Sequence, residues 1–170
     1  ADPARSGRLH FISIEKHPFR ADDLARLQAA WPELAELAAG LRRQWPALLP
    51  GVHRLSFDAG RVSLDLVFGD AVLALPQVEA RADAFYLDGF SPACNPDMWS
   101  PAVFAQLARL AAPGASLATW SVAGEVRRGL QAAGFAVERR PGFGGKRQML
   151  AGRFEGPAES PAAPVERRAL

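Results

Sequence analysis

The sequence has a single cysteine among its 170 residues, Cys94, and no apolar run approaches the roughly 20 residues that a membrane-spanning helix needs. An internal disulfide is therefore excluded, and the sequence has no zinc-type Cys/His cluster. No signal peptide is recognisable, and residues 1–8 are expected to form a short polar leader. The net charge is only +2 and 49% of the residues are hydrophobic, so we expect a soluble, cytoplasmic protein with one domain's worth of core.

Strand and helix patterns alternate along the chain. Short apolar or alternating runs predict strands at residues 9–14, 52–57, 61–68, 85–87, 116–120, 135–139 and 147–154. Apolar residues at helical spacing predict helices at residues 21–39, 71–75, 96–111 and 123–133. Asp58-Ala59-Gly60 favours a hairpin turn, Pro113-Gly114 a turn, and the glycine-rich segment PGFGGK an antiparallel connection between the last two strands. The alternation indicates an α/β protein with a doubly wound sheet.

The segment ADAFYLDGFSPACNPDMW, at residues 82–99, is the most informative part of the sequence. Asp88 stands at the carboxyl end of the predicted strand 85–87, and a loop rich in Gly and Pro follows it. Ligands of open α/β sheets bind outside the carboxyl ends of the strands. Asn95 before Pro96 is predicted to cap the next helix, which would place an acid, an amide and a helix N-terminus together.

Two further acids stand at predicted strand ends. Glu15 ends the first strand, where an acid in Rossmann-like sheets accepts hydrogen bonds from a nucleoside ribose. Asp70 follows Gly69, whose missing side chain lets the backbone approach a ligand closely. Both residues have plainer alternatives: Glu15 as a surface acid before a turn, and Asp70 as the cap of the short helix at residues 71–75.

Cations gather in the last third of the chain, although the overall charge is nearly balanced. They are Arg127, Arg128, Arg139, Arg140, Lys146 and Arg147. Such a cluster is typical either of a nucleic-acid-binding face or of an ordinary solvated surface. Arg128 has the further alternative of covering apolar surface along its own helix.

Five sequence segments carry a family resemblance that extends from about residue 9 to about residue 155. They are HFISIEKHP at 10–18, WPEL at 31–34, DGFSPACNPDMW at 88–99, RRGLQAAGF at 127–135 and GFGGKRQML at 142–150. In this order they resemble the methyltransferase domain of MnmC, a family of bifunctional enzymes that modify the wobble uridine of tRNA. The resemblance implies a Rossmann-like class I fold that has a closing antiparallel hairpin and binds S-adenosylmethionine (SAM).

The resemblance also implies that the domain is cut at both ends. The class I fold normally opens with a strand, a glycine-rich turn that wraps the methionine part of SAM, and a helix, and nothing upstream of the first predicted strand matches them. The strands at residues 9–14 and 85–87 would then each lack a ladder partner. VERRAL at residues 165–170 resembles the start of an FAD-binding strand. We therefore expect residues 9–155 to be a partial SAM-dependent methyltransferase domain and residues 156–170 a linker towards an absent FAD domain.

The activity implied by the resemblance is methyl transfer from SAM to the aminomethyl nitrogen of 5-aminomethyl-2-thiouridine at the tRNA wobble position, after the FAD domain has removed a carboxymethyl group. Asp88 is the expected catalytic residue, because a carboxylate there would orient the amine and accept its proton. The alternative for Asp88 is a strand-end acid that merely binds loop amides. The expected SAM-binding residues are Glu15, Lys16, Asp70, Asp88, Gly89 and Phe90.

The expected RNA partner is the anticodon stem-loop of tRNA, and neither a metal nor a membrane is expected. The expected contact residues are Pro92, Asn95, Met98, Trp99, Arg127, Arg128, Lys146 and Arg147. The loop residues of this set would shape a pocket for a flipped base, and the cations would contact phosphates from one edge of the sheet. Trp99 has the alternative of being a core residue.

Two positions depart from the family pattern, and two other functions stay open. Cys94 stands where relatives often carry Lys, and Glu125 stands where an aromatic residue is usual. A catalytic role for Cys94 is disfavoured, because no histidine falls in a recognisable pairing motif. The other functions are a nicotinamide-linked Rossmann oxidoreductase, in which Glu15 would bind ribose, and a non-catalytic tRNA-binding module.

Overall fold

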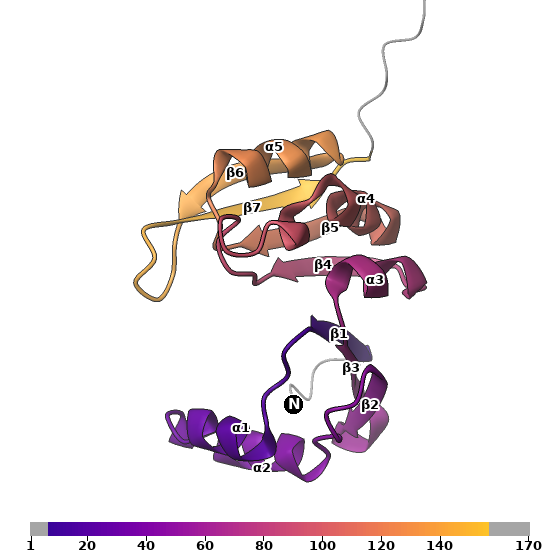
Figure 1. Cartoon of the computed structure of the whole chain (residues 1–170), viewed down its shortest axis with the longest axis vertical. Coiled ribbons are helices and arrows are strands. Elements are labelled where there is room, and N and C mark those ends of the chain that lie inside the picture. Colours follow the sequence, from indigo (N-terminus) through magenta and orange to yellow (C-terminus); the bar gives the residue numbers. More distant parts are fainter. Residues whose placement is uncertain (1–6, 157–170) are drawn as a thin grey trace, which may run out of the picture. The chain divides into compact units, whose positions relative to one another are not determined.

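The computed structural model describes residues 7–156, which divide after Ala74 into two compact units (Figure 1). Residues 1–6 of the expected leader, and residues 157–170 of the expected linker with its VERRAL end, lie outside the described residues. Each unit contains one sheet, so the strands form two separate hydrogen-bonded ladders.

The first unit has a three-stranded sheet in the order β1-β3-β2. Its strands are β1 (Leu9–Glu15), β2 (Gly51–Phe57) and β3 (Val62–Phe68). β1 and β3 run parallel, whereas β2 and β3 form the predicted antiparallel hairpin. The turn between them is left-handed, with φ of 52° at Asp58, 51° at Ala59 and 83° at Gly60. Leu55, Leu66 and Phe68 form the buried cluster of this unit.

The prediction of one continuous helix over residues 21–39 is wrong. The structure has α1 (Ala21–Gln28), the 3₁₀ turn η1 (Pro32–Leu34) and α2 (Ala35–Arg43). Pro32 has no N–H to donate and disfavours helical dihedrals in the residue before it, and Trp31 accordingly has φ −126° and ψ 75°. The apolar spacing continues across this break, which is why the pattern alone suggests one helix.

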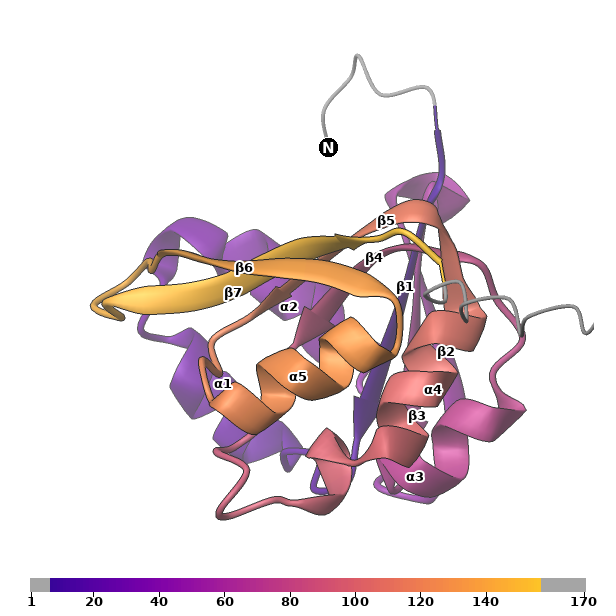
Figure 2. The ribbon, with the colours of Figure 1, turned by 90° about the horizontal axis from the view of Figure 1, so that it is seen from above.

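The second unit has a four-stranded sheet in the order β4-β5-β7-β6. Its strands are β4 (Ala82–Leu87), β5 (Ala111–Thr119), β6 (Phe135–Pro141) and β7 (Gln148–Phe154). β4 and β5 are parallel, and β7 pairs antiparallel with both β5 and β6, which confirms the closing hairpin. The helices α4 (Pro101–Leu110) and α5 (Gly124–Ala132) lie against one face of this sheet (Figure 2).

Two element boundaries of the second unit differ from the predictions. The cap expected at Asn95 and Pro96 is wrong, because the 3₁₀ turn η4 (Asp97–Trp99) comes first and α4 begins at Pro101. Ser100 is the cap, and its hydroxyl accepts a bond from the N–H of Val103 at 3.4 Å. β5 begins at Ala111, so the turn expected at Pro113-Gly114 instead lies within the strand, close to a register shift between the β4 residues Ala82 and Ala84.

Short helical elements connect the two units. They are α3 (Ala71–Ala74) and the 3₁₀ turn η3 (Leu75–Gln77). Within residues 7–156, β1 and β4 each have a hydrogen-bonded neighbour on one side only. Each of these strands is therefore an edge of its own sheet, in line with the expectation that both lack a ladder partner.

Candidate functional site

The acids predicted in the first unit meet at the carboxyl ends of two parallel strands. Glu15 pairs with Phe68 in the register of β1 and β3, and Asp70 lies two residues further along. The Lys16 ammonium contacts Oδ2 of Asp70 at 2.8 Å. Glu15 Oε1 accepts the N–H of His17 at 2.8 Å, which holds this exposed side chain against the loop. The strand ends thus bring three predicted residues together.

Asp70 is held as a carboxylate by two donors. The hydrogen bond from Lys16 lowers the pKa of the Asp70 carboxyl below its usual range, and the N–H of Val72 lowers it further. The Val72 bond is 2.8 Å long and caps the short helix α3, as the plainer alternative anticipated. Each carboxylate oxygen has a second lone pair, so capping leaves Asp70 able to accept a bond from a ligand.

Asp88 follows directly after β4 in the second unit, and its side chain is exposed. Within residues 7–156 the Asp88 carboxylate has no hydrogen bond and no ion pair, so the alternative that it binds loop amides finds no support. A Cβ added to Gly89 would lie 2.5 Å from Sδ of Met98, so a larger residue there would require the Met98 side chain of η4 to shift. The residue after the free Asp88 carboxylate is therefore closely packed against η4.

The loop after Asp88 differs from the predicted base pocket in one respect. Trp99 is only 7% exposed, and its indole N–H donates to the carbonyl of Phe90 at 2.8 Å. Trp99 is thus a core residue that closes the loop, as its alternative anticipated, and a contact of Trp99 with RNA stays a prediction. Phe90 is 79% exposed and offers an aromatic face to solvent. Asn95 contacts Sδ of Met98 at 3.8 Å, which links the two predicted pocket residues to each other.

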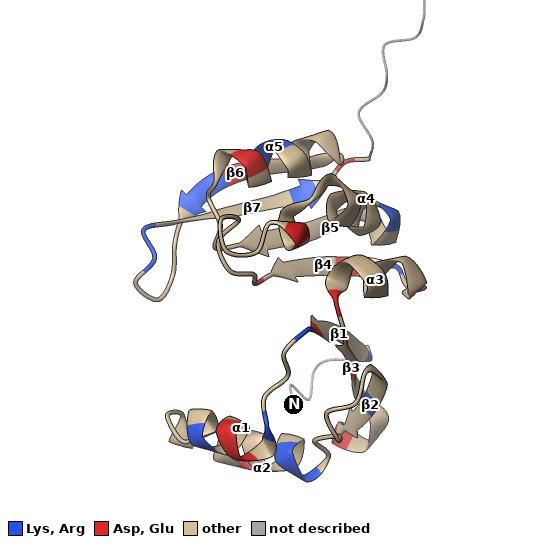
Figure 3. Ribbon diagram, in the orientation of Figure 1, with Lys and Arg blue, Asp and Glu red and all other residues tan. Residues whose placement is uncertain are grey.

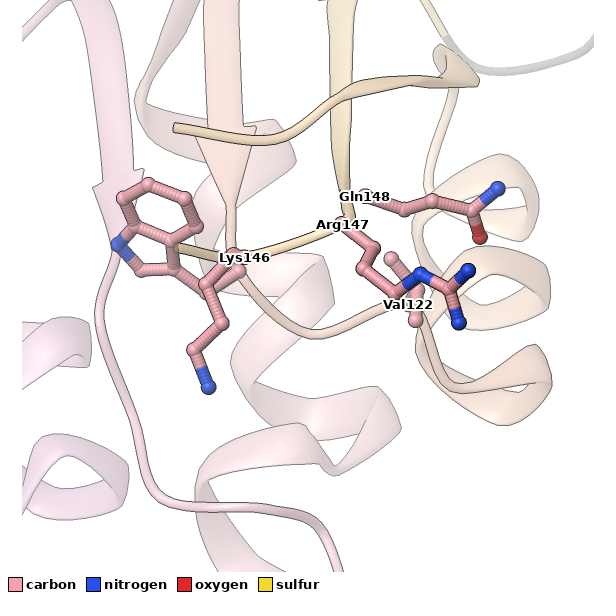
Figure 4. Close-up of a pocket in the computed structure, with 5 residues that line it drawn as sticks. Val122, Lys146, Arg147 and Gln148 are labelled. Carbon is pink, nitrogen blue, oxygen red and sulfur yellow. The ribbon is translucent and has the colours of Figure 1, made fainter. Parts of the chain in front are cut away.

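The second unit also has a pocket of about 580 Å³. Its lining residues are Trp120, Val122, Lys146, Arg147 and Gln148. Figure 4 shows that the side chains of Lys146, Arg147 and Gln148 extend in different directions from the start of β7 and the loop before it. Thr119 pairs with Leu150, which brings this loop beside the end of β5. Two of the predicted cations therefore line a defined hollow.

Trp120, Val122 and Gln148 were not among the site residues predicted from the sequence. A signal for Trp120 was available, because it follows the β5 strand directly, as Asp88 follows β4. The Val122 and Gln148 contributions depend on how the loops pack and have no comparable sequence pattern.

The two other predicted cations do not line this pocket. Arg127 and Arg128 are exposed on α5, and Arg128 folds back so that a Cβ added to Gly124 would lie 3.0 Å from its Nη1. Figure 3 shows basic positions on α5, at the end of β6 and in the loop before β7. A common phosphate-binding edge formed by all four cations stays a prediction.

Residues 7–156 contain neither a candidate metal site nor a candidate membrane-spanning helix. No group of at least 3 His, Cys, Asp or Glu side chains in this part of the chain is arranged to hold a metal ion. None of its helices is both long enough and apolar enough to span a bilayer.

Comparison with known proteins identifies the family. The sequence pattern of the family described as "S-adenosyl-L-methionine-dependent methyltransferase" matches residues 32–155. The chain is 66% identical over 170 residues to the "tRNA 5-methylaminomethyl-2-thiouridine biosynthesis bifunctional protein MnmC" of Azoarcus sp. strain BH72, covering 99% of this chain and 27% of that protein. The protein of the same name from Aromatoleum aromaticum is 61% identical over 172 residues, covering 100% of this chain and 27% of that protein. The chain thus spans about 27% of the length of these relatives.

A solved structure supports the fold. The crystal structure of MNMC2 from Aquifex aeolicus has a TM-score of 0.67 and 24% identity, over 88% of this chain and 45% of that one. Its similarity confirms the expected Rossmann-like methyltransferase fold. Together with the family match over residues 32–155, the comparisons establish that the chain belongs to the S-adenosyl-L-methionine-dependent methyltransferase family.

Proposed function

We propose that this chain transfers a methyl group from SAM to the aminomethyl nitrogen of 5-aminomethyl-2-thiouridine at the tRNA wobble position, giving 5-methylaminomethyl-2-thiouridine. The free, exposed Asp88 carboxylate at the end of β4 is the observation that carries the proposal. The names of the relatives, which are up to 66% identical, support this substrate. The family match removes the nicotinamide-linked oxidoreductase from the alternatives.

Asp88 acts on the amine in two ways under this proposal. An aminomethyl group is protonated at neutral pH, and a nitrogen that carries this proton has no lone pair for attack. The Asp88 carboxylate orients the group and accepts its proton. SAM supplies an electrophilic methyl group on a sulfonium sulfur. The new C–N bond forms as the C–S bond breaks, and the electron pair of the broken bond stays on sulfur.

The acidic strand ends suit the polar groups of SAM. Glu15 and Asp70 present carboxylate oxygens, which match the ribose hydroxyls and the adenine amino group of SAM. Lys16 is already bonded to Asp70, so we assign it the role of keeping that carboxylate charged and in place. Asp88, Gly89 and Phe90 of the second unit keep the SAM-binding role expected for them.

The RNA contacts belong to the second unit under this proposal. Pro92, Asn95 and Met98 would shape the pocket for the target base, with the exposed ring of Phe90 beside them. The anticodon stem-loop would place its phosphates on Arg127, Arg128, Lys146 and Arg147. We place the activity in the cytoplasm, where tRNA is modified, and an FAD-dependent step in the part of the full-length relatives that this chain does not span.

The test is methyl transfer by a chimera in which the chain replaces the matching segment of the Azoarcus relative. tRNA carrying 5-aminomethyl-2-thiouridine is incubated with methyl-labelled SAM, and the label is located by nucleoside mass spectrometry. Asp88→Asn is expected to lower the rate about a hundredfold or more without shifting the melting temperature. Asp83→Asn, at the other end of β4, is the control and should transfer at the normal rate.

Two results would overturn the proposal. Full activity of Asp88→Asn would remove Asp88 from the reaction. RNA binding without any methyl transfer by the unaltered chimera would favour the non-catalytic tRNA-binding module.

A further inference from the structure

The pocket beside Trp120 lies next to the proposed catalytic position. Leu87 of β4 and Thr119 of β5 are the last pair in the register, and Asp88 and Trp120 are the residues that directly follow these two parallel strands. Neighbouring strands are about 4.8 Å apart, so the chain leaves the sheet at two adjacent points, at Asp88 and at Trp120. A ligand in this pocket would therefore lie beside whatever Asp88 contacts.

The chemistry of the pocket suits an anionic, aromatic ligand. Trp120 is 40% exposed, which leaves part of its indole open to stacking. Lys146 and Arg147 are exposed and have no ion pair among residues 7–156, so their charges are available to an anion. Gln148 adds an amide that can both donate and accept. The lining contains no acid.

A nucleotide of single-stranded RNA combines the groups that this lining recognises. A base stacks on an aromatic side chain whatever its sequence, and its phosphate pairs with Lys or Arg. The volume of about 580 Å³ falls in the range of about 300–1,000 Å³ typical of small-ligand pockets.

We infer that this pocket binds an unpaired nucleotide next to the one that is methylated. Its base stacks on Trp120, its phosphate contacts Lys146 and Arg147, and Gln148 contacts the edge of the base. The position relative to the methylated base rests on the proposed function, because only that function makes Asp88 the methylation site. The pocket's preference for an RNA nucleotide rests on its own lining.

The test measures RNA binding separately from catalysis. A fluorescein-labelled anticodon stem-loop RNA is titrated with the chimera, and anisotropy gives the dissociation constant at several salt concentrations. Trp120→Ala is expected to weaken binding about fivefold to 150-fold, the value of one stacked base. Trp120→Phe should retain most of the affinity, because it keeps an aromatic face.

The cations have a matched control in the same sheet. The double variant Lys146→Ala with Arg147→Ala should weaken binding and reduce the salt dependence by about 0.7 per lost phosphate contact. The control is the double variant Arg81→Ala with Arg153→Ala, which removes the same charge from the opposite end of the strands. Arg81 precedes β4, and Arg153 lies near the end of β7, where it pairs with Ala136 and Ser116. This control should bind like the unaltered protein. Circular dichroism establishes that each variant is folded.

Several outcomes would overturn the inference. Unchanged binding by folded Trp120→Ala would do so, even if methyl transfer is normal. Equal losses of RNA affinity in the two double variants would show that the RNA is held by general charge attraction and not by a site. If free uridine monophosphate binds and Trp120→Ala leaves RNA binding unchanged, the pocket is a site for a free nucleotide and not for RNA. Conversely, absent methyl transfer with Trp120-dependent RNA binding would contradict the proposed function and leave the nucleotide pocket in place.

Discussion

At the residue scale, the strand-end acids differ in their partners, because Asp70 is bonded to Lys16 and Val72 whereas the Asp88 carboxylate has no partner within residues 7–156. Glu15, Asp70 and Asp88 were predictable because an acid that follows a short apolar run marks a strand end. Their partners were not, since the Lys16–Asp70 contact joins residues that follow two different strands. The two tryptophans show the same limit, because burial of Trp99 and exposure of Trp120 depend on how their loops pack.

The Lys16–Asp70 contact predicts a pH dependence of stability. The pKa of Asp70 is lowered in the folded protein, so its contribution is present above the unfolded value of about 3.9 and is lost as pH falls through the lower folded value. Asp70→Asn keeps an oxygen for the Val72 cap but loses the charge. The stability difference from the unaltered protein, measured by urea unfolding, should be present at neutral pH and shrink in acid. A difference that is unchanged down to the most acidic measurable pH would contradict this account, and Asp22→Asn on α1 is the control.

At the element scale, periodicity predicted the strands well and the helix limits poorly. Alternation located β1, β2 and β3 within one or two residues, because one face of each must be covered. The helix over residues 21–39 failed at Pro32, and the cap expected at Asn95 lies instead at Ser100. Ser-Pro and Asn-Pro offer similar capping chemistry, so only packing decides between them.

The contact between α4 and α5 predicts an unusual glycine effect. A Cβ on Gly129 would lie 2.2 Å from the ring of Phe104, which is itself 3% exposed. Gly129→Ala should therefore lower the free energy of unfolding by about 1–3 kcal/mol, although alanine favours helix by about 1 kcal/mol. Urea denaturation gives the value.

Gly40 in α2 provides the matched control for this prediction. A Cβ there would meet only the Arg43 guanidinium at 3.8 Å, an ordinary contact. Gly40→Ala should stabilise the protein by up to about 1 kcal/mol. Stabilisation by both substitutions would contradict the prediction, because it would show that the Phe104 ring moves aside without a loss of stability.

At the scale of the whole molecule, the order of elements was predictable and the division into two units was not. Family resemblance implied one sheet with an unpaired position beside β1 and β4, and each of these strands is an edge of a separate sheet. Both edges carry exposed apolar side chains, with Phe11 44%, Ile12 40% and Tyr86 72% exposed. Unpaired apolar edges favour association with further strands.

This surface predicts that the isolated chain is marginally stable or self-associates. Light scattering during size-exclusion chromatography should show oligomers whose proportion rises with concentration, or a melt at low temperature. A monomeric chain with a cooperative melt at high temperature would contradict the prediction.

Glu15 and Asp70 are proposed to bind SAM at the strand ends, and calorimetric titration with SAM tests this central claim most directly. The chain alone and the Azoarcus chimera are compared with chimeras that carry Glu15→Ala or Asp70→Ala. We predict that the chimera binds SAM and that each alanine weakens binding about tenfold or more, as expected for loss of a hydrogen bond to a charged group. Absence of binding by the chimera, or unchanged affinity in both alanine variants, would contradict the claim.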